Sequence, residues 1–330
     1  MSVDGRTVRV GAIDVGSNSI RLLVADVPVH RDQGALTTIS RVGESCRLGR
    51  GLGRTGRIDP EIAGRAAALA ADFVRRARAM GATRLVVGAT AALRGADNGM
   101  AVASAIGERC GVPVRILSGD EEAQLVYEAV VLGLGVMARH SPCVVFDLGG
   151  GSTEVVSGVG ERAGRWTSLP LGAVVLTERY LHSTPPTEDE IAALLRHVES
   201  ELGQRCAAMP ESTPLLAAVG GTVTVLAALD RGLTAYEPSL LEGWTLEPAR
   251  LEALVDRVVR SNEGERRSWA VMGRGRSDIV VAGALVVRTM AHRFPSRGLV
   301  CSTQGLRYGL ARLAGRGVSE SPDGSGHLHG

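Results

Sequence analysis

A short run of residues in the middle of the chain combines acids, hydroxyl groups and glycines in a way that suits phosphate chemistry. Apolar residues lead into Asp147, and three glycines, two hydroxyl residues and Glu154 follow. Consecutive glycines lack a Cβ, so the backbone can turn tightly and direct several N–H groups at one anion. Asp147 and Glu154 add carboxylates of the kind that bind a hard cation such as Mg²⁺. We therefore predict a β-hairpin tip that binds phosphate through Gly149, Gly150, Gly151, Ser152 and Thr153.

The same order of residue types occurs near the amino terminus. An apolar run ends at Asp14, and a glycine, small polar residues and Arg21 follow before the next apolar run. Two such strand–Asp–Gly–strand hairpins in one chain predict two similar α/β halves whose hairpin tips face each other across a cleft. Asp14 then joins Asp147 and Glu154 as a candidate metal ligand. The predicted phosphate contacts in this copy are Gly16, Ser17, Asn18 and Arg21.

Composition restricts the classes of protein to which this chain can belong. Its 330 residues, 45% of them hydrophobic, suffice for two domains with a substantial core. The net charge of only +2 argues against a general binder of nucleic acids or membrane surfaces. The sequence has no lysine, so all 37 basic residues are arginine. This excludes a lysine-dependent P-loop and a Schiff-base mechanism, and any cationic contact with phosphate must be a guanidinium group.

The cysteines and the apolar segments indicate a cytoplasmic protein. The five cysteines are scattered and free of CxxC spacing, which is typical of reduced, mostly buried thiols. No signal-peptide apolar region precedes the first strand, and no apolar run is long enough to span a bilayer. We therefore expect a cytoplasmic location and no membrane partner.

Two further segments carry charged residues suited to the same chemistry. Residues 41–57 are dense in glycine and arginine with a single acid. Such a loop can line a channel for a polyanion, although a solvated connection is an equal alternative for each arginine. Further along, Ser118 opens a helix whose first turn holds Glu121 and Glu122. Acids are common in a first helical turn because the helix dipole favours them, so this position alone does not indicate catalysis.

The paired hairpins and the acidic helix start together resemble the exopolyphosphatase and guanosine pentaphosphate phosphohydrolase (Ppx/GppA) family in its short form. Residues 14–21, 147–154 and 118–127 carry the likeness, which continues in order over nearly the whole chain. That family belongs to the superfamily of sugar kinases, Hsp70 and actin. The resemblance implies an α/β fold with two similar actin-like (ribonuclease H-like) lobes, which have mixed sheets and a cleft between them.

The resemblance also implies roles for residues outside the hairpins. The family's proposed general base is the last glutamate of the acidic helix start, which is Glu122 here, with Glu121 in reserve. A carboxylate in that place would orient an in-line water and accept its proton. Arg94 and Arg276 match positions from which arginines face the phosphates. Gly221 lies in a loop that approaches a nucleotide or the far end of a phosphate chain.

The same resemblance divides the chain into parts. We expect a first lobe over residues 1–123 and a second over 124–302, followed by a closing helix at about 303–314 that packs back on the first lobe. Residues 315–330 are expected to form a disordered tail, since they are rich in Gly, Ser and His. Longer family members carry a further helical domain that this sequence lacks. The closing segment also has no acid at Thr303 or Tyr308, where members often have one.

The resulting prediction is an exopolyphosphatase that uses Mg²⁺, or Mn²⁺ in its place, to release terminal phosphate from inorganic polyphosphate by attack of water. From the family we also expect a homodimer. Hydrolysis of guanosine pentaphosphate (pppGpp) is an alternative, although the lack of the helical domain favours polyphosphate. Two other classes are an ATP-dependent small-molecule kinase, with ATP bound at Gly220 and Gly221, and an actin-like assembly protein. Both require a nucleotide, so phosphate release without one separates them from the main prediction.

Overall fold

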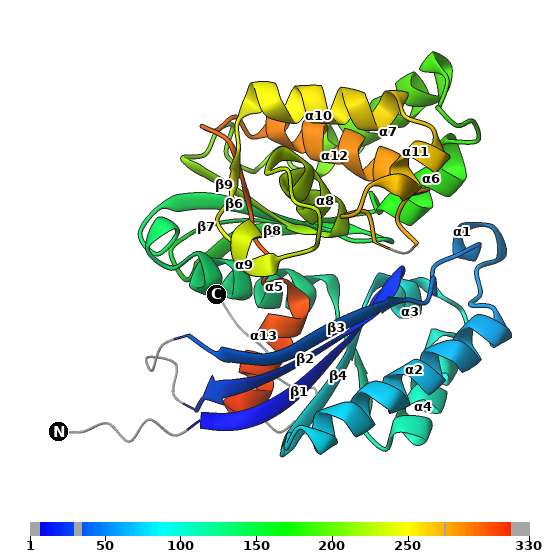
Figure 1. Ribbon diagram of the computed structural model, residues 1–330, viewed down its shortest axis with the longest axis vertical. Helices are drawn as coiled ribbons and strands as arrows, with labels where there is room; N and C mark the ends of the chain where they lie inside the picture. The colour runs from blue at the N-terminus through cyan, green and yellow to red at the C-terminus, as the bar shows by residue number, and fades with distance from the viewer. Residues whose placement is uncertain (1–6, 30–34, 274, 318–330) are drawn as a thin grey trace.

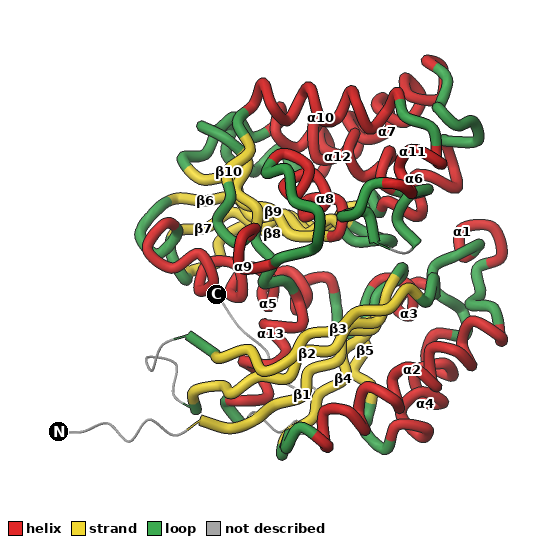
Figure 2. The backbone as a smooth tube through the Cα atoms, in the orientation of Figure 1, coloured by secondary structure: helices red, strands yellow, loops and turns green. Residues whose placement is uncertain are grey.

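The computed structural model describes residues 7–29, 35–273 and 275–317, which form an α/β arrangement of strands and helices (Figure 1, Figure 2). The strands are β1 (Thr7–Val15), β2 (Ser19–Pro28), β3 (Thr37–Ser45), β4 (Arg84–Ala89), β5 (Val114–Ile116), β6 (Pro142–Leu148), β7 (Thr153–Val159), β8 (Arg162–Leu169), β9 (Leu215–Gly220), β10 (Thr245–Leu246) and β11 (Leu299–Cys301). The helices are α1 (Leu52–Thr55), α2 (Pro60–Ala79), α3 (Ala91–Gly95), α4 (Gly99–Cys110), α5 (Gly119–Leu134), the 3-10 turn η1 (Gly135–Met137), α6 (Ala173–Tyr180), α7 (Glu188–Arg205), α8 (Gly221–Asp230), α9 (Pro238–Leu241), α10 (Pro248–Arg260), α11 (Glu263–Ser268), α12 (Val280–Arg293) and α13 (Leu306–Gly315).

The strands form two sheets that share one topology. In the first sheet the order is β3-β2-β1-β4-β5, with antiparallel pairing from β3 to β1 and parallel pairing from β1 to β5. In the second sheet β8-β7-β6-β9-β11 repeats this order and these directions, and β10 is added at the edge. The prediction of two similar α/β lobes with mixed sheets is therefore confirmed.

Three apolar clusters hold the layers together. One cluster fills the space between the two sheets, where β1, β2 and β6 pack on α5 and α13 through residues such as Tyr127, Val145 and Leu310. A second joins the outer face of the second sheet to α7, α8, α10 and α12, and a third joins the outer face of the first sheet to α2 and α4. Figure 1 shows α13 below α5 and against the first sheet, although α13 is the last helix in the sequence.

Capping residues set the start of the long helices, including the start at Ser118 that the sequence predicted. Asp59 accepts hydrogen bonds from the N–H groups of the first turn of α2, with a proline at the first helical position. Ser118 and Glu121 form a reciprocal capping box at the start of α5, and Thr187 with Glu190 does so at α7. Caps of this kind contribute about 1 kcal/mol each, so they fix where the helices begin.

Two segments differ from the sequence prediction. Residues 41–45 of the expected loop 41–57 belong to β3, because they pair with β2. Gly315, expected in the tail, ends α13. Residues 318–330 of the predicted disordered tail lie outside the described residues.

Two expectations from composition can also be compared with the structure. All five cysteines are buried and unbridged, as predicted. Within the three described ranges, no helix combines the length and apolar character needed to cross a membrane.

Candidate active site

The tips of the two glycine-containing hairpins are in direct contact. A Cβ atom added at Gly150 would lie 3.2 Å from the backbone nitrogen of Asn18, and one at Gly151 would lie 2.6 Å from Ser17 Oγ. A side chain at either position would therefore push the tips apart, which explains the glycines. Asp14 and Asp147, one from each hairpin, consequently line a common cavity between the lobes.

The two tips also have the same local geometry. The N–H of Gly16 donates to the carbonyl of Ser19 at 3.1 Å, and the N–H of Gly149 donates to the carbonyl of Ser152 at 3.0 Å. Each bond closes the turn between two antiparallel strands just after the aspartate. The repeated sequence pattern is thus a repeated structure, as expected from the order of residue types.

The side chain of Thr153 packs inside the protein at the second hairpin tip. It is fully buried, and its Oγ1 donates to the carbonyl of Leu171 at 2.7 Å. The nearby carbonyl of Gly150 accepts the N–H of Val174 at 3.0 Å, which ties the tip to the start of α6. Because successive side chains of a strand point to opposite faces, Thr153 turns inward where Ser152 faces the pocket. Thr153 is not among the residues that line the two spaces described below, and its contact with phosphate stays a prediction.

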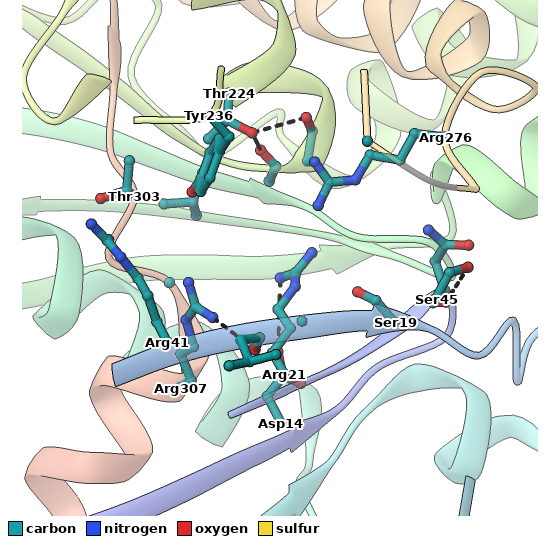
Figure 3. Close-up of a pocket in the computed structure, with 18 of the residues that line it drawn as sticks. Asp14, Ser19, Arg21, Arg41, Ser45, Thr224, Tyr236, Arg276, Thr303 and Arg307 are labelled. Carbon is teal, nitrogen blue, oxygen red and sulfur yellow. Dashed lines mark hydrogen bonds and ion pairs between the residues drawn. The ribbon is translucent and has the colours of Figure 1, made fainter. Parts of the chain in front are cut away.

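Most of the predicted site residues line two adjoining spaces. The inner pocket, about 50 Å³ beside Glu122, is lined among others by Asp14, Gly16, Ser17, Asn18, Arg21, Glu122, Asp147, Gly149, Gly150, Gly151, Ser152 and Glu154. The outer cavity, about 790 Å³, shares Asp14, Asn18, Arg21 and Asp147 with the inner pocket and is also lined by Gly221 and Arg276 (Figure 3). Its volume is that of an ordinary small-molecule site, about 300–1,000 Å³. Arg94 lines neither space and reaches the inner pocket through Glu122.

Glu122 lies near the start of α5 with its carboxylate at the inner pocket. The side chain is buried, and Arg94 Nη1 donates to Glu122 Oε2 at 3.0 Å and to the carbonyl of Leu117 at 2.7 Å. Burial, followed by the negative charge of Glu154, raises the pKa of Glu122 well above its usual range, and Arg94 opposes this shift. A carboxylate with a raised pKa accepts a proton more readily than an ordinary one, as a general base requires.

Glu121, the reserve candidate, has different surroundings. Its carboxylate accepts the N–H of Ser118 at 2.9 Å, which completes the capping box, and it forms an ion pair with Arg115. Burial raises the pKa of Glu121, but the bonds from Ser118 and Arg115 outweigh burial and lower it. Glu121 is not among the residues that line the inner pocket or the outer cavity. Its contacts are those of a helix-capping residue.

The three predicted metal ligands line the inner pocket, where Asp14 and Glu154 are buried and Asp147 is half-buried. Glu154 Oε1 accepts hydrogen bonds from Ser152 Oγ at 2.7 Å and from Ser168 Oγ at 2.9 Å. Burial, followed by the charge of Glu154, raises the pKa of Asp147 to about 7, and burial also raises the pKa of Asp14 and of Glu154. Carboxylates gathered in this way destabilise one another's charged forms.

This donor set suits Mg²⁺ or Mn²⁺ by ligand type, because hard cations prefer carboxylate oxygens and would offset the crowded negative charge. In the described part of the chain, no group of three or more His, Cys, Asp or Glu side chains is close enough to hold a metal ion. Mg²⁺ commonly keeps several waters and takes only one or two carboxylates, so a looser arrangement fits it.

The outer cavity is lined by four arginines, Arg21 and Arg276 as candidates from the sequence and Arg41 and Arg307 in addition (Figure 3). Arg21 lies 3.8 Å from Asp14. Burial, followed by the charge of Arg21, lowers the pKa of Arg276 to about 10, and the same two causes lower the pKa of Arg307. Like charges held together in this way favour the entry of an anion.

The double-glycine loop gives Arg276 its place in the cavity. Gly220, with φ +126°, ends β9 in a conformation that favours glycine, and Gly221 begins α8. A Cβ atom at Gly221 would lie 3.0 Å from Arg276 Cζ, so the guanidinium group packs directly on the glycine backbone. The predicted pair of Gly221 and Arg276 is thus brought together from two distant segments.

Sequence reasoning did not single out three residues that line the outer cavity: Arg41, Arg307 and Tyr236. Arg41 was covered by the expectation that residues 41–57 can line a polyanion channel. Arg307 stands next to Tyr308 in the closing segment. Its positive charge was the feature that could have marked it as a candidate phosphate contact. Tyr236 is one of only four tyrosines, but it lies in a loop with no recognisable motif.

Fold and site together define a class of protein: a two-lobed α/β protein with paired phosphate-type loops facing an arginine-lined cleft. The sequence matches the Ppx/GppA phosphatase family over residues 27–312. The chain therefore belongs to this family, and the resemblance stated from its motifs is confirmed.

Individual relatives agree with this assignment. "Exopolyphosphatase 2" of Mycobacterium tuberculosis is 35% identical over 295 residues, which cover 88% of this chain and 92% of the relative. The crystal structure of an exopolyphosphatase-like protein superposes with a TM-score of 0.88 at 29% identity, covering 94% of this chain and 99% of the other. The Aquifex aeolicus member of the Ppx/GppA family superposes with a TM-score of 0.77 at 27% identity, covering 92% and 96% of the two chains.

Proposed function

We propose that this protein is an exopolyphosphatase, a phosphoanhydride hydrolase that releases terminal phosphate from inorganic polyphosphate by attack of water. The observation that carries the proposal is the joining of an inner pocket, with a buried carboxylate at Glu122, to an outer cavity lined by four arginines. A chain of phosphates is an anion long enough to occupy both spaces. Similarity to proteins named exopolyphosphatase supports the choice of substrate.

In the proposed reaction the loops hold the terminal phosphate and Glu122 acts on the water. Gly16 and Gly149 close the two turns, and the N–H groups of residues 17–18 and 150–152 with the hydroxyl of Ser17 would donate to the phosphate oxygens. Arg21 would neutralise the next phosphate. The Glu122 carboxylate would orient a water in line with the leaving oxygen and accept its proton. Arg94 would keep that carboxylate in place and ionised, because it donates to Oε2 at 3.0 Å.

Asp14, Asp147 and Glu154 are the residues that we propose to hold Mg²⁺, or Mn²⁺, directly or through water. A divalent cation at this place would neutralise charge that develops on the phosphate oxygens. The raised pKa of all three carboxylates supports a cation there, because an added positive charge would relieve the effect of burying them together.

The direct test is release of free phosphate from long-chain polyphosphate with Mg²⁺ and no nucleotide. The proposal expects steady release of phosphate that stops when EDTA is added. A kinase would release none without ATP and an acceptor, and an actin-like assembly protein would need ATP. Absence of phosphate release under these conditions, with a correctly folded protein, would refute the proposal.

Hydrolysis of pppGpp is the second candidate, and one observation favours it. Tyr236 lines the outer cavity and is 45% exposed, so its ring can stack on a base. Tyr236→Ala should then weaken hydrolysis of pppGpp but leave that of polyphosphate little changed. Assaying both substrates side by side with this variant decides between them.

Three further expectations remain proposals: a homodimer, a cytoplasmic location, and the division into lobes at residues 1–123 and 124–302. Sedimentation of the purified protein tests the first, and fractionation of cells tests the second. Limited proteolysis near the start of α5 tests the third.

A further inference from the structure

The outer cavity has two arginines that the inner pocket does not share. Arg41 comes from β3 and Arg307 from the first turn of α13, and both line the outer cavity only. Arg21 lines both spaces, so it lies between Glu122 and this outer pair. Figure 3 shows Arg41 and Arg307 close together on one side of Arg21, whereas Arg276 approaches from the opposite lobe.

Within the described part of the chain Arg307 forms no ion pair, although the charges of Arg307 and Asp14 attract each other across the cavity. Burial, followed by the charge of Arg21, lowers the pKa of Arg307, and Arg41 acts in the same direction. Its one hydrogen bond in the described structure runs from Nη1 to the carbonyl of Val42 at 3.5 Å. A guanidinium group that is crowded by two others and has no ion-pair partner among the described residues is available to an anion from outside.

Arg41 is held in place by a neutral group. Its Nη1 donates to the phenol oxygen of Tyr308 at 3.2 Å, and that oxygen also lies 3.4 Å from Thr38 Oγ1. Tyr308 is buried and uncharged, so the contact orients Arg41 without forming an ion pair, and no other described residue forms one with Arg41. By contrast, Arg47 on the neighbouring loop forms an ion pair with Asp278 at 2.9 Å.

The charges around the outer cavity are positive on balance. Four arginines line it, against the carboxylates of Asp14, Asp147 and Glu44. Asp14 Oδ2 lies 3.8 Å from Arg21 Nη1, so its negative charge is partly offset. Glu44, on β3, lines the same cavity and is exposed to solvent.

We propose that Arg307 and Arg41 form a second phosphate subsite, which binds phosphate groups remote from the cleaved bond and sets the preference for long chains. The inference rests on the proposed function, because it needs a substrate with a remote end. The chain would run from Glu122 past Arg21 and leave the cleft beside β3. Tyr308 is a positioning residue that holds Arg41 toward this path.

The test compares long-chain polyphosphate with tripolyphosphate, which is too short to use the remote subsite fully. The measured quantity is the ratio of kcat/KM on the long chain to kcat/KM on tripolyphosphate. Arg41→Gln and Arg307→Gln should each lower this ratio about tenfold or more, because each removes a charged hydrogen bond that only the long chain makes. The slope of log KM against log salt for the long chain should also become shallower.

Matched variants separate charge from packing. Arg78→Gln removes an exposed arginine at the far end of α2 and should leave the ratio unchanged. Tyr308→Glu should lower the ratio as much as Arg41→Gln, since a carboxylate there would neutralise Arg41. Tyr308→Phe should lower it less, and Arg41→Lys should restore part of it. A thermal melt of each variant checks that the fold is intact.

The outcomes distinguish the inference from the function on which it rests. If the unaltered protein releases no phosphate from any chain, the proposed function fails. If it releases phosphate but both arginine variants keep the ratio and the salt slope within twofold of the unaltered protein, the remote subsite is wrong and the function stands. Calorimetric binding of long-chain polyphosphate to Glu122→Gln, with and without Arg41→Gln, gives the same decision without turnover.

Discussion

Arg94 Nη1 lies 3.0 Å from Glu122 Oε2 at the inner pocket, and it is the cation paired with that buried carboxylate among the described residues. Burial and Glu154 raise the pKa of Glu122, whereas Arg94 opposes them. The balance between these effects determines how much of the carboxylate is ionised at a given pH. Catalysis by Glu122 and the pH at which it operates are therefore linked through one ion pair.

Substituting Glu122 by glutamine should nearly abolish phosphate release while leaving polyphosphate binding largely intact. An amide of the same shape cannot accept the proton of the water, and loss of a general base costs about 10²–10⁴-fold in rate. Phosphate release measures the rate, and calorimetry measures binding. Glu121→Gln is the control, because Glu121 caps α5 and pairs with Arg115 outside the inner pocket. Full turnover by Glu122→Gln would remove Glu122 from the mechanism.

Arg94→Gln should shift the acidic limb of the pH–rate profile upward. Arg94 lowers the pKa of Glu122, so without it the carboxylate stays protonated to a higher pH, and protonated Glu122 cannot act as a base. An opposite charge at this distance commonly changes a pKa by about one unit or more. The measurement is kcat/KM for phosphate release as a function of pH. Arg115→Gln, beside Glu121, should leave the limb in place, and an unshifted limb in Arg94→Gln would contradict the assignment.

The sequence predicted the parts of the site that are continuous in the chain. Each hairpin tip is a run of adjacent residues, so its geometry follows from glycines, an aspartate and small polar residues in order. The place of Glu122 in a first helical turn likewise follows from Ser118, which caps its helix, whereas its role came from the family resemblance. These features depend on local rules for turns and helix starts, and such rules act within a few residues.

The missed features depend on contacts between distant segments. Arg41 and Tyr308 are 267 residues apart in sequence, and they meet only because α13 returns to the first sheet. The side chain of Thr153 turns into the core, and its direction depends on where β7 begins. A one-residue difference in strand register reverses which side chains face a pocket, and sequence alone does not fix that register.

Asp147→Asn should make the metal-free protein more stable at alkaline pH. The pKa of Asp147 is raised to about 7 in the folded state from an ordinary value of 3.8, so folding favours its protonated form. This stabilisation is complete below pH ~3.8 and is lost as the pH rises to about 7. The amide carries no charge to bury, so its Tm at pH 8 should exceed that of the unaltered protein by about 2 °C or more.

Adding Mg²⁺ in the same experiment should reverse that order. A ligand that binds only the folded state raises Tm according to its affinity, and the amide at position 147 is a poorer ligand than the carboxylate. The measurement is the Tm of both proteins at pH 5 and at pH 8, each with EDTA and with Mg²⁺. Equal responses of the two proteins to Mg²⁺ would show that Asp147 does not hold the metal.

Gly309→Ala should destabilise the protein because α13 packs tightly on α5 there. A Cβ atom at Gly309 would lie 2.4 Å from the carbonyl oxygen of Leu125, so the two helices would have to move apart. Overpacking of this kind costs about 1–3 kcal/mol in the free energy of unfolding. Gly64→Ala is the matched control, since Gly64 is exposed within α2 and has open space around it, so alanine should stabilise by about 0.5–1 kcal/mol. Urea unfolding measures both, and equal stability of the two variants would contradict the docking of α13 on α5.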